Sequence, residues 1–137
     1  MSTLRLTTIS NQTGSSSVPS ETVINGSAKA WVNFNGTGTV AIRASFNVSS
    51  ITDNTTGDYT VNFTNALTDA NYSVVGMGRR NGGASNSGYG PVVSISGATA
   101  PTTTALRIWT VDVQSSSSAS SIVIVSDLSS VNVAVFR

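Results

Sequence analysis

Residues 28–48, AKAWVNFNGTGTVAIRASFNV, carry the clearest structural signal in this chain of 137 residues. Apolar side chains alternate with polar or small ones on both sides of the central NGTGT segment, a pattern typical of half-buried β-strands. The alternation predicts two strands joined by a hairpin, because glycine-rich segments between such runs are typical of turns. The predicted core side contains the even-numbered residues Ala28, Ala30, Val32, Phe34, Val40, Ile42, Ala44, Phe46 and Val48.

The register of this hairpin can be predicted from parity. A two-residue Asn-Gly turn would point one strand's apolar set outward, so the loop should contain an odd number of residues. Pairing Phe34 with Val40 meets this condition and places Trp31 opposite Arg43 on the outer face. An exposed guanidinium stacked on an indole contributes about 0.5–1 kcal/mol, and such a flat pair is similar to platforms that hold sugar rings. Trp31 and Arg43 are therefore candidate ligand-binding residues, and packing of this face against a neighbouring subunit or loop is the alternative.

The rest of the chain continues the β pattern. Tyr59, Val61 and Phe63 predict a third strand, which completes a meander over residues 28–64. Further strands are expected at residues 72–77, 92–96, 106–113, 122–125 and 131–136, with another at 4–9. So many short strands in one small chain predict an all-β fold, an antiparallel β-sandwich or jelly-roll-like single domain.

A Ser-rich segment, residues 11–21, separates the first expected strand from the meander. We therefore expect an N-terminal strand or arm over residues 1–21 and a β-sandwich domain over residues 22–137.

Composition excludes several classes of site. Cys and His are absent, which excludes disulfides, thiolate or imidazole metal sites and a Ser-His-Asp relay. A net charge of +1 with scattered cations lacks the clustered basic face of nucleic-acid-binding proteins. No apolar run is long enough for membrane insertion. We expect no cofactor and no bound metal, and the low charge leaves self-association unopposed.

The carboxylates give little support for catalysis. A glycoside hydrolase needs two carboxyl groups that face each other across the sugar bond. Asp53 and Asp58 flank a turn, where Asp commonly accepts backbone N–H bonds. We therefore expect a non-enzymatic protein, with a small glycan hydrolase as the weakest alternative. The full set is Glu21, Asp53, Asp58, Asp69, Asp112 and Asp127.

A glycine-rich loop, residues 79–90, supplies further candidate ligand-binding residues. Arg79 and Arg80 lie at its start and Tyr89 lies near its end. Two cations and an aromatic ring on a loop tip are suited to an acidic polysaccharide. A solvated hairpin end with ordinary charges is the alternative.

Three segments resemble a known family. AKAWVNFNGTGTVAIR (residues 28–43), SFNVSSITDN (45–54) and GDYTVNF (57–63) are similar to a segment that recurs in virion proteins of tailed bacteriophages, of the tail-fibre type. The resemblance is to a structural segment and carries over no active-site residues. It implies an all-β homotrimer located in the virion and assembled in the cytoplasm of the host bacterium.

The resemblance implies a compact tail fibre or tip protein that attaches to host surface polysaccharide. Residues 1–21 would then anchor it to tail or baseplate proteins. The alternative is a capsid decoration, or cement, protein whose arm lies along the major capsid protein. A free carbohydrate-binding module is a third alternative.

Overall fold

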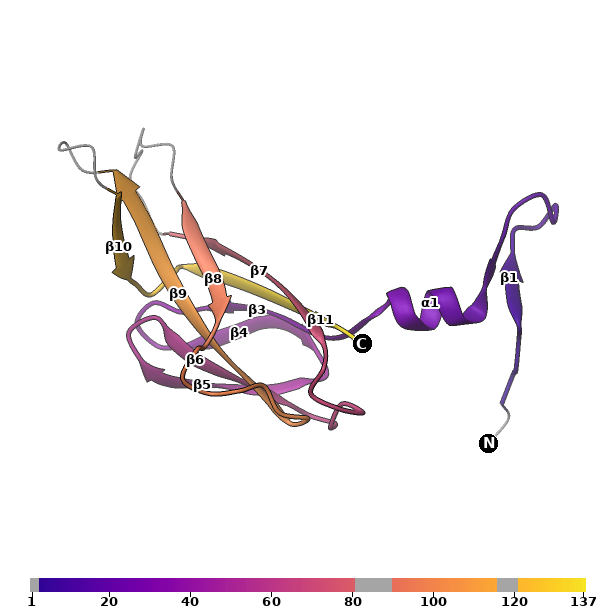
Figure 1. Ribbon diagram of the computed structural model, residues 1–137, viewed down its shortest axis with the longest axis horizontal. Helices are drawn as coiled ribbons and strands as arrows, with labels where there is room; N and C mark the ends of the chain where they lie inside the picture. Colours follow the sequence, from indigo (N-terminus) through magenta and orange to yellow (C-terminus); the bar gives the residue numbers. More distant parts are fainter. Residues whose placement is uncertain (1–2, 81–89, 116–120) are drawn as a thin grey trace.

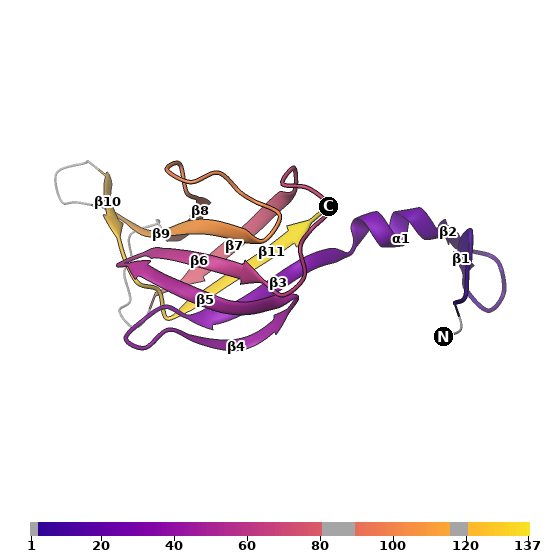
Figure 2. The ribbon, with the colours of Figure 1, turned by 90° about the horizontal axis from the view of Figure 1, so that it is seen from below.

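The computed structural model describes residues 3–80, 90–115 and 121–137. It consists of two antiparallel sheets packed as a sandwich, with an N-terminal arm that projects from one end (Figures 1 and 2). The predicted all-β sandwich is confirmed.

The arm, residues 3–27, contains a small hairpin and a short helix. Strands β1 (Thr8–Ser10) and β2 (Ser17–Pro19) pair antiparallel, and α1 (Ser20–Gly26) follows directly. Of the strand expected over residues 4–9, only the C-terminal end belongs to β1. The helix lies across the expected boundary between residues 21 and 22, and the first sandwich strand begins at Ala28.

One layer of the sandwich, which we call the β3 sheet, has the strand order β4-β3-β11-β7. Its strands are β3 (Ala28–Asn35), β4 (Ala41–Phe46), β7 (Ser73–Arg79) and β11 (Ser130–Phe136).

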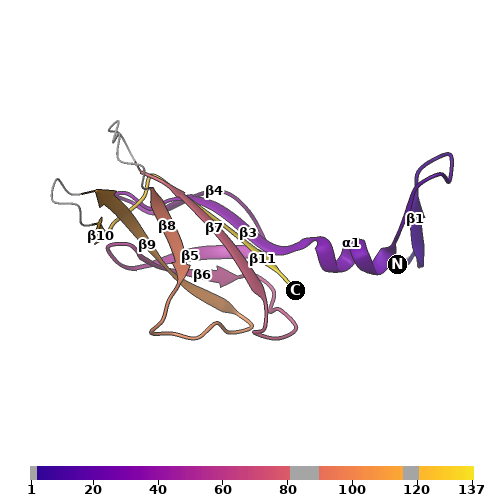
Figure 3. The same ribbon diagram turned by 45° about the horizontal axis from the view of Figure 1, so that its top comes forward.

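The second layer, the β9 sheet, is organised around its longest strand. β9 pairs with β8 on one side, and on the other with β6 through residues 105–109 and with β10 through residues 111–115. β5 lies beyond β6. The edge strands β7 and β8 of the two layers lie side by side (Figure 3). The strands of this sheet are β5 (Val48–Thr55), β6 (Asp58–Phe63), β8 (Pro91–Ile95), β9 (Ala105–Ser115) and β10 (Ser121–Val125).

The predicted three-stranded meander is wrong because the chain changes sheets at Asn47. β4 pairs with β3 in one layer, whereas β5 pairs with β6 in the other. Asn47 has a φ of 54°, a left-handed conformation that Asn tolerates better than most residues. Its side-chain amide donates to the carbonyls of Lys29 (3.1 Å) and Asn65 (3.2 Å). One side chain thus holds the corner where the two layers join.

The predicted register of the first hairpin is also wrong: Phe34 pairs with Ile42 in place of Val40, a shift of two residues, and β4 then contains a bulge at Arg43. Phe34 pairs with Ile42 on one side of the bulge, and Trp31 pairs with Phe46 on the other. The extra residue reverses the alternation along β4. Phe46, expected in the core, therefore shares the outer face with Trp31 and is 56% exposed.

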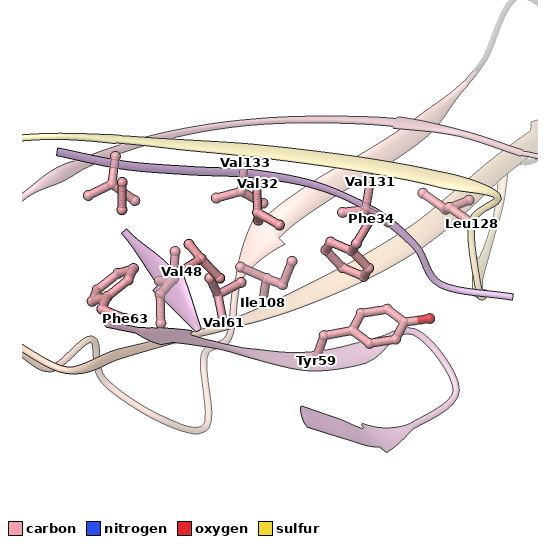
Figure 4. Close-up of a cluster of buried hydrophobic side chains, with 13 residues drawn as sticks. Val32, Phe34, Val48, Tyr59, Val61, Phe63, Ile108, Leu128, Val131 and Val133 are labelled. Atoms are coloured by element: carbon pink, nitrogen blue, oxygen red, sulfur yellow. The ribbon is translucent and has the colours of Figure 1, made fainter. Parts of the chain in front are cut away.

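The core lies between the two sheets (Figure 4). The prediction for β3 is confirmed at Ala30, Val32 and Phe34, but all six residues of β4 are exposed. Phe34 meets Tyr59 edge to face, with ring centroids 5.2 Å apart. The buried apolar cluster is Ala30, Val32, Phe34, Val48, Tyr59, Val61, Phe63, Leu106, Ile108, Leu128, Val131, Val133 and Val135.

Candidate functional site

The outer face of the β3 sheet carries an exposed apolar row. Strand pairing aligns, from β4 to β7, the side chains of Phe46, Trp31, Ala134 and Val75. Trp31 is 40% exposed and Val75 57%, and nearby Met77 is 71% exposed. We call these five residues the Trp31 face. Large exposed apolar patches mark interaction surfaces, since leaving them in water is unfavourable.

A groove with a volume of about 530 Å³ crosses this face from Trp31 to Arg79. Asn33 and Asn132, which are paired across β3 and β11, line it. The amide of Asn33 donates to Asn132 Oδ1 (2.5 Å) and to Ser130 Oγ (3.0 Å). Because these polar groups bond to one another, the groove offers a partner mainly apolar contact.

Arg43 does not form the predicted stack with Trp31. Its Nη2 donates to the carbonyl of Ser129 at 2.6 Å, on the loop that precedes β11. The two-residue shift of register, together with the bulge, places Phe46 and not Arg43 opposite Trp31. The paired platform expected from the sequence is therefore not formed.

The cations of the second candidate site lie at the end of the sandwich opposite the arm. Arg79 ends β7 and lines the groove of the Trp31 face. Arg80 Nη1 donates to Asp112 Oδ2 at 2.9 Å, and Asp112 is only 5% exposed. Tyr89 lies outside the described residues. The structure thus brings Arg79 and Trp31 to one groove and directs Arg80 into an ion pair.

Asp58 is held by a two-pronged ion pair. Arg107 donates through Nε to Asp58 Oδ1 (2.8 Å) and through Nη2 to Asp58 Oδ2 (2.6 Å), and the Asn54 amide adds a bond of 3.1 Å. The bonds from Arg107 hold the pKa of Asp58 below its usual value, although burial acts in the opposite direction. Both groups lie on outward-facing positions of the β9 sheet, where the pair connects β6 to β9.

Asp127 has a structural role that the sequence did not reveal. Its Oδ1 accepts the backbone N–H of Gly57 (2.7 Å) and the hydroxyl of Tyr59 (2.6 Å). Burial, followed by the bond to Asp127, raises the pKa of Tyr59 and keeps the phenol protonated. The two partners lie 70 and 68 residues earlier in the chain, so no local pattern indicates this contact.

Asp69 forms an exposed ion pair with Arg137 and also accepts the N–H of Asn71 (2.7 Å). The bonds from Arg137 lower the pKa of Asp69, and the pair raises that of Arg137. Four carboxylates, at positions 58, 69, 112 and 127, are thus bonded to cations or to groups that hold the fold. In the part of the chain that is described, no cluster of three or more acidic, His or Cys side chains could hold a metal ion.

The arm is a second uncovered apolar surface. Across residues 3–27, all of which are described, no side chain is buried, and Ser20 alone is half-buried. The helix α1 has no side-chain cap at its N-terminus. The exposed apolar side chains of the arm are Leu4, Leu6, Ile9, Val18, Val23 and Ile24.

No protein-family model, curated protein or solved structure matches this chain. Among the residues described, no helix has the length and apolar character needed to span a membrane.

Proposed function

We propose that this chain is a non-enzymatic structural protein of a tailed-bacteriophage virion, a compact tail fibre or tip that attaches to host surface glycans. The resemblance of residues 28–63 to virion proteins is the first support. The second, and the observation that carries the assignment to an attachment protein, is the placement of the two ends. The arm projects from one end of the sandwich (Figures 1 and 3). Arg79, which is paired with Ser130 at the start of β11, lies at the other end.

This placement separates an anchoring end from a contacting end. Ala28, where the arm joins β3, is paired with Phe136, which is paired with Ser73 at the start of β7. Arg79 ends the same strand, so the full length of β7 lies between it and the root of the arm. A subunit of this kind can be fixed at the end that carries the arm while its far end meets a host surface. A homotrimer is the proposed assembly.

The bonds of the carboxylates support the non-enzymatic part of the proposal. Proton transfer by Asp58 or Asp112 would require breaking an ion pair with Arg107 or Arg80. Asp127 accepts a hydrogen bond from the hydroxyl of Tyr59. Groups bonded in this way stabilise the fold and are poorly placed to exchange protons with a sugar.

Arg79 is the proposed principal contact to an acidic glycan. It is exposed and lines a groove, and a guanidinium binds carboxylate or sulfate groups through paired hydrogen bonds. Arg80 and Tyr89 are proposed as further contacts. Trp31 lines the arm-proximal part of the groove.

The location is tested by immunogold labelling of whole particles, with label on the tail as the expected result. Label on neither tail nor head would contradict a virion role.

The glycan contact is tested by adsorption of particles that carry Arg79→Gln. We expect the equilibrium affinity of the particles for the host surface to fall by about tenfold, the equivalent of roughly 1.4 kcal/mol of binding free energy. Arg43→Gln removes the same charge at a residue bonded to backbone and should leave adsorption unchanged. Equal adsorption by both variants would contradict the contact.

A capsid decoration protein is the second candidate, and the exposed apolar arm favours it. An arm with six uncovered apolar side chains is suited to lie along neighbouring capsid subunits. Label on the head would support this function, and deletion of residues 1–21 should then release the protein and leave the shell more fragile.

A further inference from the structure

Among the described residues, and apart from exposed Val side chains on the β9 sheet such as Val92 and Val123, two uncovered apolar surfaces lie on different parts of the molecule. One is the Trp31 face, on the outside of the β3 sheet. The other is the arm, whose apolar side chains face solvent along its whole length. Burying apolar area lowers the free energy by about 25 cal/mol per Å², so covering either surface is favourable.

The arm cannot be expected to hold its structure alone. Its helix has seven residues, and each of its strands has three. Helices shorter than about 12 residues are marginal in water, and an isolated two-stranded hairpin is marginal as well. With no buried side chain, the arm lacks the packing that stabilises such elements in proteins.

The arm is also not packed onto its own sandwich. It extends away from the two sheets in all three ribbon views (Figures 1–3). At its root, an open cavity of about 500 Å³ lies between Ile24 of α1 and Leu67 of the sandwich. The arm therefore needs a surface that its own chain does not supply in this conformation.

We propose that the arm of one copy of this chain docks on the Trp31 face of a second copy. The hairpin of the arm pairs Ile9 with Val18, which places both on one side of it. The Trp31 face presents a complementary row of Trp31, Val75 and Met77. Like-charge repulsion does not oppose the contact, because the arm carries one cation, Arg5, and one anion, Glu21.

A second copy is favoured over other occupants because one chain contains both surfaces. Every copy then gives an arm and receives one, so the arrangement covers both the arm and the Trp31 face without another protein. Such a contact joins two different surfaces. It closes either when two copies exchange their arms or when several copies form a ring. This inference concerns the isolated protein and does not rest on the virion assignment.

The experiment measures the mass of the purified full-length protein in solution by light scattering. We expect the wild-type protein to be oligomeric, with a mass that is a multiple of 14.0 kDa. An arm variant carries Leu6→Glu, Ile9→Glu and Val18→Glu, and a face variant carries Met77→Glu. All four positions are exposed, so both variants should keep their strand content by circular dichroism and should be monomeric. Val92→Glu, at a Val on the β9 sheet that is 46% exposed, should remain oligomeric.

Mixing the two monomeric variants gives the decisive result. The arm variant keeps an intact face and the face variant keeps an intact arm, so a mixture should form a complex that contains both. Failure to form it would overturn the proposal, as would a monomeric wild-type protein. Dissociation by Val92→Glu with no effect of Met77→Glu would also overturn it, because the interface would then lie on the other sheet.

Trp31 fluorescence separates exchange between copies from the arm's folding back on its own face. In a Trp109→Phe background Trp31 is the remaining indole, and a docked arm should shift its emission to shorter wavelength than in the arm variant. A blue-shifted emission in a monomeric protein would indicate folding back and overturn the exchange. An emission unaffected by the arm variant, but shifted by an added acidic polysaccharide, would assign the face to a glycan instead.

Discussion

Large apolar side chains are buried in the core of the sandwich but exposed in the arm. In the sandwich, Phe34, Tyr59 and Leu128 have no measurable exposure (Figure 4). In the arm, Leu4 is 83% exposed and Ile24 60%. The difference shows that the two regions obtain their order from different sources. The sandwich obtains its stability from its own core, whereas the arm depends on a surface outside its own domain.

The largest effect should come from the centre of the core. Phe34→Ala removes a fully buried ring that contacts Tyr59 and should lower the free energy of unfolding by about 3–5 kcal/mol. Urea unfolding followed by circular dichroism measures the loss. Phe46→Ala is the matched control, because this ring is 56% exposed and should cost less than about 1 kcal/mol in the monomeric face variant. Similar losses would contradict the placement of the two rings.

Two glycines with left-handed backbone conformations, one in each region, allow a direct comparison of the effect of an Ala substitution on stability. Gly57 in the sandwich has a φ of 65°, and an added Cβ would lie 2.6 Å from the carbonyl oxygen of Thr110. Gly14 in the arm has a φ of 70°, and a Cβ added there would meet nothing within 4 Å beyond its chain neighbours. Gly57→Ala should therefore cost about 2–3 kcal/mol of global stability, because the clash adds to the backbone strain. Gly14→Ala should leave the unfolding of the sandwich unchanged, and a comparable loss from both variants would show that the arm is part of the same folding unit.

The ion pair of Asp58 predicts a pH dependence of the sandwich. The pKa of Asp58 is lower in the folded protein than in the unfolded chain, where it lies near 4. The ion pair therefore stabilises the fold at pH values above the unfolded pKa, and this stabilisation is lost as the pH falls through the folded pKa. Asp58→Asn should cost about 1–3 kcal/mol at pH 7 and should reduce the acid sensitivity of unfolding. Asp69→Asn, at a more exposed pair, should cost less at the same pH. Urea midpoints between pH 7 and pH 2 test both, and an unchanged pH profile in Asp58→Asn would contradict the assignment.

The smallest effect should come from the arm itself. In the monomeric face variant, deletion of residues 1–27 should change the free energy of unfolding of the sandwich by less than about 0.5 kcal/mol, since the arm buries no side chain. The face variant with its arm intact is the reference. A loss of several kcal/mol would mean that the arm packs on its own sandwich.

Much of the sandwich could be predicted from local sequence. The alternation along residues 28–35 and 58–63 placed Val32 and Val61 in the core, and both are buried. The strands expected at 106–113 and 131–136 are present as β9 and β11. These predictions succeeded because side chains of a regular strand alternate between its faces, whatever lies far away in the sequence.

The candidate site was less predictable, because it depends on irregular positions. The pairing of β4 is shifted by two residues from the predicted register, and the bulge at Arg43 then exchanges the faces of the residues that follow, so that Trp31 has Phe46 as its neighbour in place of Arg43. The exposed row of the Trp31 face also needs β7 and β11, which pair with each other across more than fifty residues of chain. No local pattern specifies which outer-face residues such strands bring together.

The sequence by itself determined the strand-forming segments, the inward faces of β3 and β6, and the absence of Cys and His chemistry. The tertiary structure alone decided the change of sheet at Asn47, the register at Arg43, and the bonds of Asp127 to Gly57 and Tyr59. The physical reason is the range of the forces involved. Alternation and turn preference act between neighbours in the chain, whereas a bulge, a sheet crossing or a buried hydrogen bond is stable only when distant segments supply the matching partner.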